Sequence, residues 1–136
     1  MNDFELAPPL PVPTPTSKPF WDGLADERVM LQRCDACGHW VFYPRERCSH
    51  CLADALAWHE VSGAARLYTW TLCERPPSPH FNAWGPFLLA VVELEEGVRM
   101  TTNLVDADAA SLKAGMALAP VFVREDDVTL LRYRPA

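Results

Sequence analysis

Four cysteines in two Cys-x-x-Cys pairs are the residues of this chain whose types and spacing most clearly predict chemistry. Cys34 and Cys37 form the first pair, Cys48 and Cys51 form the second, and ten residues separate the two pairs. Together they supply the four thiolates that tetrahedral Zn²⁺ prefers. Because four protein ligands leave no open coordination position, the predicted zinc, one per chain, is structural and not catalytic.

The residues around the cysteines fit such a site. Gly38 directly follows the first pair and can adopt a positive φ, which lets backbone amides point at the sulfurs. Leu52 occupies the same place after the second pair, so a less regular turn is expected there. Four thiolates around Zn²⁺ carry a net charge of about −2, which favours nearby cations. The candidate cations are Arg33, Arg45 and Arg47.

Two disulfides or a redox site are the alternative interpretations of these cysteines. Residues 1–10 are acidic and contain prolines, unlike the basic and apolar start of a signal peptide, so an oxidising compartment is not indicated. A redox pair would precede a helix, whereas these pairs flank a β-prone run at 39–43. The pattern therefore favours a zinc ribbon, and we expect the chain to be cytoplasmic.

No further group of residues predicts catalysis. Cys73 lies in a β-prone segment and is typical of a buried small hydrophobe. The four histidines are scattered, and the carboxylates at 93–96 are explained by a solvated hairpin turn. An independent enzyme that uses Cys73 or His80 stays one of three function hypotheses, but we assign no catalytic residue.

Four arginines are candidates for binding an anionic ligand. A coenzyme A site needs a few cations beside an aromatic or apolar groove, and it does not need a globally basic surface. The candidates lie on predicted strands or at their ends, and they are Arg66, Arg75, Arg99 and Arg124. The alternative for each of them is an ordinary solvated surface arginine.

The segment 75–86 is expected to be a loop because it contains four prolines. It also carries His80, Phe81 and Trp84, which are candidate interface residues. Burying Phe or Trp against a partner removes a large apolar area from water at little entropic cost. The alternative is that Phe81 and Trp84 fold back onto the same chain.

Length and composition limit the class of protein. The chain has 136 residues, of which 49% are apolar, so it can form one domain or two very small ones. Its formal charge of −6 is the opposite of the balance on which sequence-independent nucleic-acid binding depends. No apolar run approaches the roughly 18 residues of a membrane-spanning helix. We therefore expect neither a nucleic acid nor a membrane as the partner.

The first elements should position the zinc ribbon. Ser17 can cap a short helix that ends near Asp26, with Phe20 and Leu24 on one face. A strand over 29–33 is then expected to lead into the first cysteine pair.

From Leu56 onward, β-prone segments alternate with turns. These segments are 56–62, 66–74, 87–95, 98–105, 116–124 and 128–133. Asp106 or Asp108 can cap a helix through Ala114, with Gly115 as its stop. For the region from Leu56 onward, the prediction is an OB-fold barrel of five strands with this helix between the third and fourth strands.

The predicted fold class is mainly β, in three parts. Residues 1–19 hold six of the thirteen prolines and predict an extended arm, which is either a disordered tail or a strap over a partner. The N-terminal helix and zinc ribbon follow over 20–55, and the OB-fold over 56–136. The ribbon alone would be too small to fold without its metal.

An ordered set of motifs over about residues 17–134 resembles the DUF35 family. The matching motifs are Pro19-Phe-Trp-Asp-Gly-Leu, Cys34-x-x-Cys37-Gly38, Pro44, Cys48-x-x-Cys51, Gly63, Tyr68-x-Trp-Thr71 and Gly115-Met116. Leu52 replaces a glycine that is usual in the family, and the loop between the first two barrel strands has its own composition. The resemblance implies an N-terminal helical segment, a rubredoxin-like zinc ribbon and an OB-fold.

The same resemblance implies a function. DUF35 proteins are associated with acyl-CoA metabolism and commonly accompany thiolase-like or lipid-transfer-like enzymes, including aldolase complexes that shorten steroid side chains. In these assemblies the partner carries the catalytic residues. We therefore expect a non-catalytic subunit that completes the substrate channel of such a partner, with acyl-CoA as a ligand. The alternative is a nucleic-acid-binding zinc ribbon and OB-fold module, which fold analogy alone supports.

Overall fold

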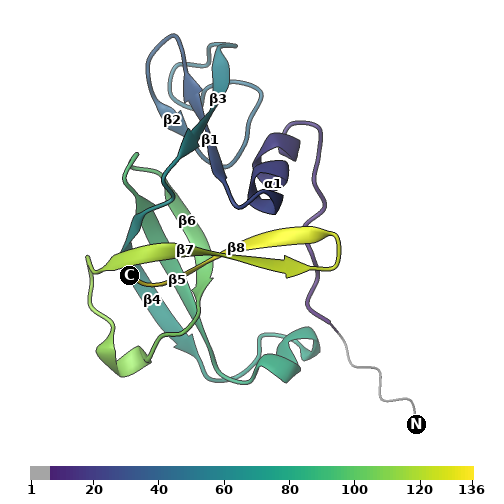
Figure 1. The fold of residues 1–136 in the computed structure, drawn as a ribbon, viewed down its shortest axis with the longest axis vertical. Coiled ribbons are helices and arrows are strands. Elements are labelled where there is room, and N and C mark those ends of the chain that lie inside the picture. The colour runs from purple at the N-terminus through teal and green to yellow at the C-terminus, as the bar shows by residue number, and fades with distance from the viewer. Residues whose placement is uncertain (1–6) are drawn as a thin grey trace.

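The structure, a computed structural model, describes residues 7–136 as a small three-stranded sheet next to a five-stranded barrel, with one helix packed beside both (Figure 1). The expected fold class is confirmed: the chain is mainly β, with a short N-terminal helix, a ribbon that carries four clustered cysteines, and a closed five-stranded barrel.

The small sheet contains β1 (Val29–Cys34), β2 (Trp40–Val41) and β3 (Leu56–Val61), in the antiparallel order β2-β1-β3. The segment from Leu56, expected as the first strand of the barrel region, forms β3, which pairs with β1 along its whole length. The physical reason is the short β2, which covers only part of one edge of β1. Since β1 is mostly buried, its backbone groups need a full-length partner on the other edge.

The barrel consists of β4 (Ala65–Cys73), β5 (Phe87–Leu94), β6 (Arg99–Leu104), β7 (Ala117–Glu125) and β8 (Val128–Pro135). Its strands close in the order β4-β5-β6-β8-β7, which is the OB-fold arrangement. Two junctions are narrow: β6 meets β8 in parallel at one residue pair, and β4 meets β7 at two. Closure pairs every strand of this sheet on both sides.

Two short 3₁₀ helices interrupt the barrel connections. The segment before β7 was expected to be a helix through Ala114, but it contains only η2 (Ala109–Ser111). Asp108 does cap it, accepting a hydrogen bond from the amide of Ala110. The next residue, Leu112, has an extended backbone conformation and a buried side chain, so the helix ends before it. The expected loop 75–86 contains the other short helix, η1 (Pro79–Trp84).

The N-terminal helix α1 (Lys18–Ala25) ends next to its C-cap residue Asp26, as expected, and buries Phe20 and Leu24. Ser17, however, does not cap it with its side chain. Its buried hydroxyl instead accepts a hydrogen bond from the amide of Thr14 at 2.9 Å. Ser17 therefore fixes the arm to the helix instead of capping the helix amides.

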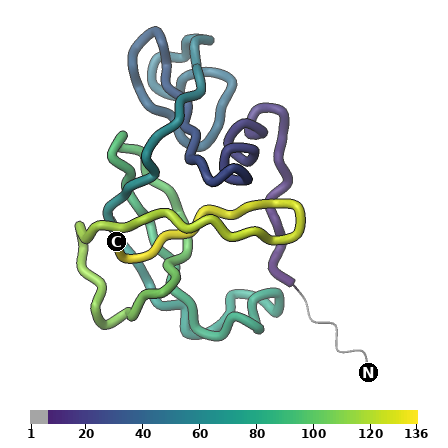
Figure 2. The backbone as a smooth tube through the Cα atoms, viewed as in Figure 1, coloured from purple at the N-terminus to yellow at the C-terminus, as the bar shows by residue number. Residues whose placement is uncertain are grey.

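The described part of the arm, residues 7–16, lies on this chain's own barrel. It runs past the tip of the β7–β8 hairpin (Figure 2). Pro8, Leu10 and Pro11 are half-buried, whereas Val12 is exposed. Residues 1–6 of the predicted arm lie outside the described residues. Within residues 7–136, no helix has the length and apolar character that crossing a membrane requires.

One hydrophobic core joins the helix, the base of the ribbon and the barrel. Phe20 and Leu24 of α1 and Leu31 of β1 pack in the same cluster as barrel residues such as Leu67 and Tyr133. A second, smaller cluster lies at the tip of the ribbon and contains two of the four motif cysteines. The ribbon tip is thus the part of the fold that depends least on the barrel.

Candidate metal centre and candidate interface

The four cysteine sulfurs lie close enough together to hold one metal ion. All four Sγ atoms lie within 4.8 Å of one another, with 3.6 Å between Cys34 and Cys51 and 3.7 Å between Cys37 and Cys48. Tetrahedral Zn–S bonds of about 2.3 Å require sulfurs roughly 3.8 Å apart, whereas a disulfide requires about 2.05 Å. The spacing fits zinc, and all four thiols are free.

Two matching turns place these sulfurs. The amide of Gly38 donates to the carbonyl of Cys34 at 2.8 Å, and the amide of Leu52 donates to the carbonyl of Cys48 at 3.0 Å. Gly38 has a φ of +77° and Leu52 a φ of +65°. The second turn was expected to be less regular, but it has the same hydrogen bond and the same left-handed residue. Leu52 therefore adopts a conformation that normally favours glycine.

Backbone amides prepare the second turn for a thiolate. The amides of Cys51 and His50 donate to Cys48 Sγ at 3.5 and 3.3 Å, and these bonds lower the pKa of Cys48 to about 6. The His39 amide lowers the pKa of Cys37, but desolvation and the three neighbouring thiols outweigh it and raise that pKa to about 12. Without a cation, four thiols this close cannot all ionise. The donor set therefore calls for a metal ion.

The arginines expected near the zinc site form hydrogen bonds with the backbone of the turns and not with the cysteine sulfurs. Arg33 Nε donates to the carbonyl of Gly38 at 3.1 Å, and Arg47 Nη1 donates to the carbonyl of Leu52 at 3.4 Å. Each turn is thus held by one arginine. Among the described residues, no hydrogen bond joins Arg33, Arg45 or Arg47 to a cysteine sulfur.

Two of the four candidate ligand arginines lie in one cross-strand row. Arg66 on β4 pairs with Glu93 on β5, which pairs with Arg99 on β6. Arg99 donates to Glu93 at 2.9 Å and lies 3.8 Å from the ring centre of Tyr68. The hydrogen bond that Arg99 donates to Glu93 raises the pKa of Arg99. This glutamate offsets part of the positive charge that an anionic ligand would need.

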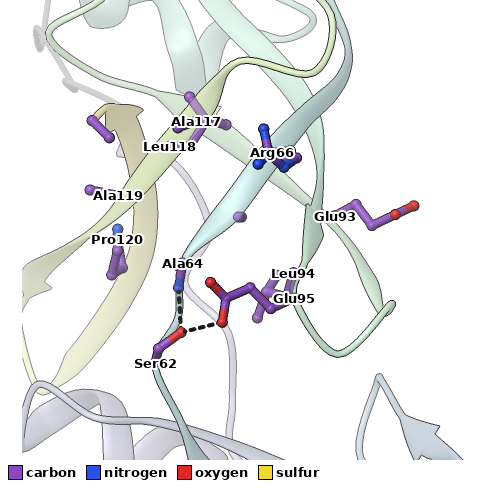
Figure 3. Close-up of a pocket in the computed structure, with 12 residues that line it drawn as sticks. Ser62, Ala64, Arg66, Glu93, Leu94, Glu95, Ala117, Leu118, Ala119 and Pro120 are labelled. Atoms are coloured by element: carbon purple, nitrogen blue, oxygen red, sulfur yellow. Dashed lines mark hydrogen bonds between the residues drawn. The ribbon is translucent and has the colours of Figure 1, made fainter.

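A cavity of about 470 Å³ borders this row at the β4–β7 junction (Figure 3). Arg66 lines it and donates to the carbonyl of Gly115 at 3.0 Å. Glu95 turns toward Ser62, whose hydroxyl donates to it at 3.3 Å, while Glu93 points away. With two carboxylates and one arginine, the cavity does not favour a polyanion.

The other two arginines lie elsewhere. Arg75 is exposed two residues beyond the end of β4, far along the strand from Arg66. Arg124 lies near the β7–β8 turn, where its Nε donates to the carbonyl of Asp126 at 3.2 Å. The structure therefore does not bring the four arginines into one site.

The candidate interface aromatics form a cluster at the end of the barrel that carries η1. Trp84 lies 5.0 Å from Phe81 and 5.1 Å from Phe87, measured between ring centres. Phe81 is half-buried, whereas Trp84 is 38% exposed. His80 is exposed beside them, 3.4 Å from the hydroxyl of Ser78. The rings thus pack on each other and on the barrel while leaving an aromatic surface.

Sequence reasoning missed Arg132. It lies on β8, is half-buried, and its guanidinium lies 5.9 Å from the ring centre of Trp84. Together with Phe81 and Trp84 it lines a cavity of about 220 Å³. The signal in the sequence is an arginine inside the apolar run 128–133, between Leu131 and Tyr133. Only the fold shows that η1 and the arm reach it.

Two family models match the ribbon and the barrel regions, and their boundary lies inside β3. The family model described as "ChsH2, rubredoxin-like zinc ribbon domain" matches residues 21–57, and "ChsH2, C-terminal OB-fold domain" matches residues 58–123. The zinc-ribbon match and the four-sulfur geometry both support a structural zinc ion.

Two relatives are similar to this chain along most of its length. A "DUF35 domain-containing scaffold protein" of Pyrococcus furiosus is 35% identical over 121 residues, which are 85% of this chain and 88% of the relative. A "Probable enoyl-CoA hydratase alpha subunit" of Thermomonospora curvata is 33% identical over 119 residues, but the chain spans only 37% of that relative.

A solved structure described as "Ltp2-ChsH2(DUF35) aldolase" contains a similar chain. The similarity has a TM-score of 0.80 at 28% identity and covers 93% of this chain and 98% of that one. The ribbon, the barrel and the near-complete match to a scaffold relative agree with the motif resemblance. The chain belongs to the DUF35 family.

Proposed function

We propose that this chain is a non-catalytic accessory subunit that docks on an acyl-CoA-processing enzyme and completes its substrate channel. The observation that carries the proposal is the near-complete structural match to the DUF35 chain of the "Ltp2-ChsH2(DUF35) aldolase". The relative named a scaffold protein, matched over 88% of its length, supports a role in assembly.

The proposed partner is a thiolase-like or lipid-transfer-like enzyme, such as one in a steroid side-chain aldolase complex. The relative named as a hydratase alpha subunit supports a partner in acyl-CoA chemistry, because this chain corresponds to about a third of it. A unit that occurs both in a short scaffold protein and within a longer enzyme subunit behaves as a module. We infer that the function of such a module depends on the enzyme to which it is attached or bound.

The aromatic cluster of Phe81, Trp84 and Phe87 is the surface we propose for docking. Trp84 is partly exposed at the barrel end, and its neighbours hold the ring in place. A preordered aromatic side chain loses little entropy on binding and is the type that dominates protein interfaces. His80, exposed on the same 3₁₀ helix, would lie at the rim of this contact.

If acyl-CoA touches this chain, Arg75 is the best of the four sequence candidates. Arg66 and Arg99 are less suitable because they flank the carboxylate of Glu93. Arg124 is less suitable because it donates a hydrogen bond to the Asp126 carbonyl in the β7–β8 turn. Arg75 is exposed at the same end of β4 as η1, where the docked enzyme would lie. A guanidinium at that edge could hold a coenzyme A phosphate between the two proteins.

The test is co-purification of this chain, tagged at its C-terminus, from its native cells, followed by identification of the bound protein and an acyl-CoA turnover assay. We expect an acyl-CoA-processing enzyme in a fixed ratio to the tagged chain. Recovery of the chain without such an enzyme, at protein concentrations in the micromolar range, would overturn the proposal. Binding of nucleic acid that falls steeply with salt would instead favour the alternative module.

A further inference from the structure

Two cavities have Arg132 on β8 as a common lining residue. One, of about 220 Å³, lies between the arm, η1 and the β7–β8 hairpin, and the other, of about 250 Å³, lies between α1, the ribbon and β8. Each cavity alone is smaller than the roughly 300–1,000 Å³ of typical small-molecule sites, so a ligand of that size would have to occupy both, past Arg132. We call them the Arg132 groove. It is lined mainly by Leu10, Trp21, Tyr43, Phe81, Trp84 and Arg132.

The guanidinium of Arg132 has spare hydrogen-bonding capacity. Among residues 7–136 it forms no ion pair and no hydrogen bond, although it is half-buried. Burial lowers its pKa, and Glu125 offsets this only through a longer-range interaction. The Arg132 nitrogens are not among the fully buried unpaired atoms of the described residues, so water still reaches them, and a bound anion would take the place of that water as hydrogen-bond acceptor.

Aromatic side chains form part of the wall on both sides of Arg132. Phe81 and Trp84 face the cavity on one side, and Phe42 and Tyr43 face it on the other. The indole of Trp21 donates to the Tyr43 hydroxyl at 3.1 Å, which fixes that end. A ligand that fills both cavities must therefore be elongated and mostly apolar.

The charge near the groove limits the ligand to one negative charge. Glu125 and Asp126 line the cavity on the side of Trp84. They would repel a phosphate or any other polyanion that reached past Arg132. A carboxylate carries a single charge and matches the two parallel N–H donors of a guanidinium.

We propose that the Arg132 groove binds an elongated apolar molecule that carries one carboxylate, with the carboxylate on Arg132 and the apolar body between the aromatic walls. This site goes beyond the proposed function: all of its lining comes from this chain, and Phe81 and Trp84 are shared with the proposed docking surface. The described part of the arm, at 7–10, forms one side of the site.

The test uses the zinc-loaded full chain and two probes, decanoate below its critical micelle concentration and the uncharged decanol below its solubility limit. Binding is followed through the indole N–H signals of Trp21 and Trp84 in two-dimensional NMR. Trp58 and Trp70, which do not line the groove, are internal controls. We expect saturable shifts of Trp21 and Trp84 with decanoate, and at least tenfold weaker binding of decanol.

Variants separate the site from general apolar adsorption. Arg132→Gln should weaken decanoate binding at least tenfold and leave decanol binding unchanged, while Arg132→Lys should show an intermediate affinity. Arg134→Gln, an exposed arginine on the same strand, is the matched control and should bind decanoate normally. Equal affinity of the two probes, or of Arg132→Gln and the unaltered chain, would overturn the proposal. So would an Arg132→Gln chain that binds decanoate normally but no longer assembles with its enzyme partner, which would assign the groove to that partner.

Discussion

Leu52 shows how one residue can satisfy a metal turn at a local cost. Its amide closes the second cysteine turn as Gly38 closes the first, yet its φ of +65° crowds the side chain against its own backbone. The side chain is 71% exposed, so packing within the described chain repays little of this strain. The geometry of the four-sulfur site is what holds Leu52 in place.

Leu52→Gly should therefore stabilise the chain. Relief of the left-handed strain, about 1–2 kcal/mol, exceeds the extra entropy that glycine gains on unfolding, about 0.5–1 kcal/mol. We expect a net gain of about 0.5–1 kcal/mol in the free energy of unfolding, measured by urea denaturation with zinc bound. Leu52→Ala keeps the strain and serves as the control. If the glycine variant is no more stable than the alanine variant, this account of the turn fails.

The local spacing of residues along the sequence was enough to predict the metal site, but not the surroundings of the arginines. The four motif cysteines needed only their own spacing to indicate a tetrahedral site. The partners of Arg66 and the surroundings of Arg132 depend on strand register and on the path of the arm, which no local pattern contains. The candidate arginines therefore had the right residue type for an anion site, while the half-buried arginine was overlooked.

Among the elements, the link between β3 and β4 determines how the ribbon meets the barrel. Gly63 lies in this link with a φ of +78°, and its carbonyl accepts a hydrogen bond from the buried Tyr133 hydroxyl at 2.7 Å. A Cβ at this position would lie 2.9 Å from Val29 and 3.1 Å from Pro120. The backbone here approaches both domains as closely as glycine allows.

Gly63→Ala should destabilise the whole chain by about 2–4 kcal/mol, because it adds overlap with Val29 and Pro120 to the strain of a positive φ. Gly97→Ala is the matched control, since Gly97 also has a positive φ but open space around it, and it should cost about 1 kcal/mol. Thermal unfolding of both variants measures the difference. Equal losses would mean that Gly63 is a turn residue only.

Zinc removal should act on the ribbon tip before the barrel. The tip has its own small cluster around Cys34, Val41 and Cys48, whereas the base of the ribbon shares the barrel core. Structural zinc contributes roughly 10–16 kcal/mol to small zinc-binding peptides, far more than such a cluster can supply.

We therefore expect a chelator, or Cys48→Ser, to abolish hydrogen-exchange protection in residues 34–55 while β5 and β6 stay protected. Cys73→Ser is the control and should retain one zinc per chain in elemental analysis. A chelated chain with an intact tip would contradict the structural role of the metal. Global unfolding would show that the two clusters are not independent.

Sequence patterns predicted most elements but not all of their pairings. The strands from 66 onward and the helix with Phe20 and Leu24 on one face follow from periodicity, which is local. The place of β3 could not follow from it, because its pairing depends on which edge of β1 is left uncovered by the two-residue β2. The short η2 likewise depends on Leu112 reaching a core that only the closed barrel creates.

At the scale of the whole molecule, the aromatic cluster at the η1 end is the proposed contact with the enzyme. Phe81→Ala combined with Trp84→Ala should weaken assembly by about 2 kcal/mol or more, a thirtyfold rise in Kd, because buried aromatic residues carry much of the energy of interfaces. Isothermal titration with the purified partner measures it. Tyr43→Ala, which removes an exposed aromatic residue from the ribbon, is the control and should leave Kd unchanged. An unaltered Kd for the double variant would place the interface elsewhere.

Our proposal that this chain acts through another protein can be tested with purified components. Acyl-CoA turnover is measured for the purified chain, for the purified partner enzyme and for their equimolar mixture, with zinc bound throughout. The account predicts no turnover by the chain alone and a turnover by the mixture well above that of the partner alone. Full turnover by the isolated chain, or a mixture no more active than the partner, would contradict it.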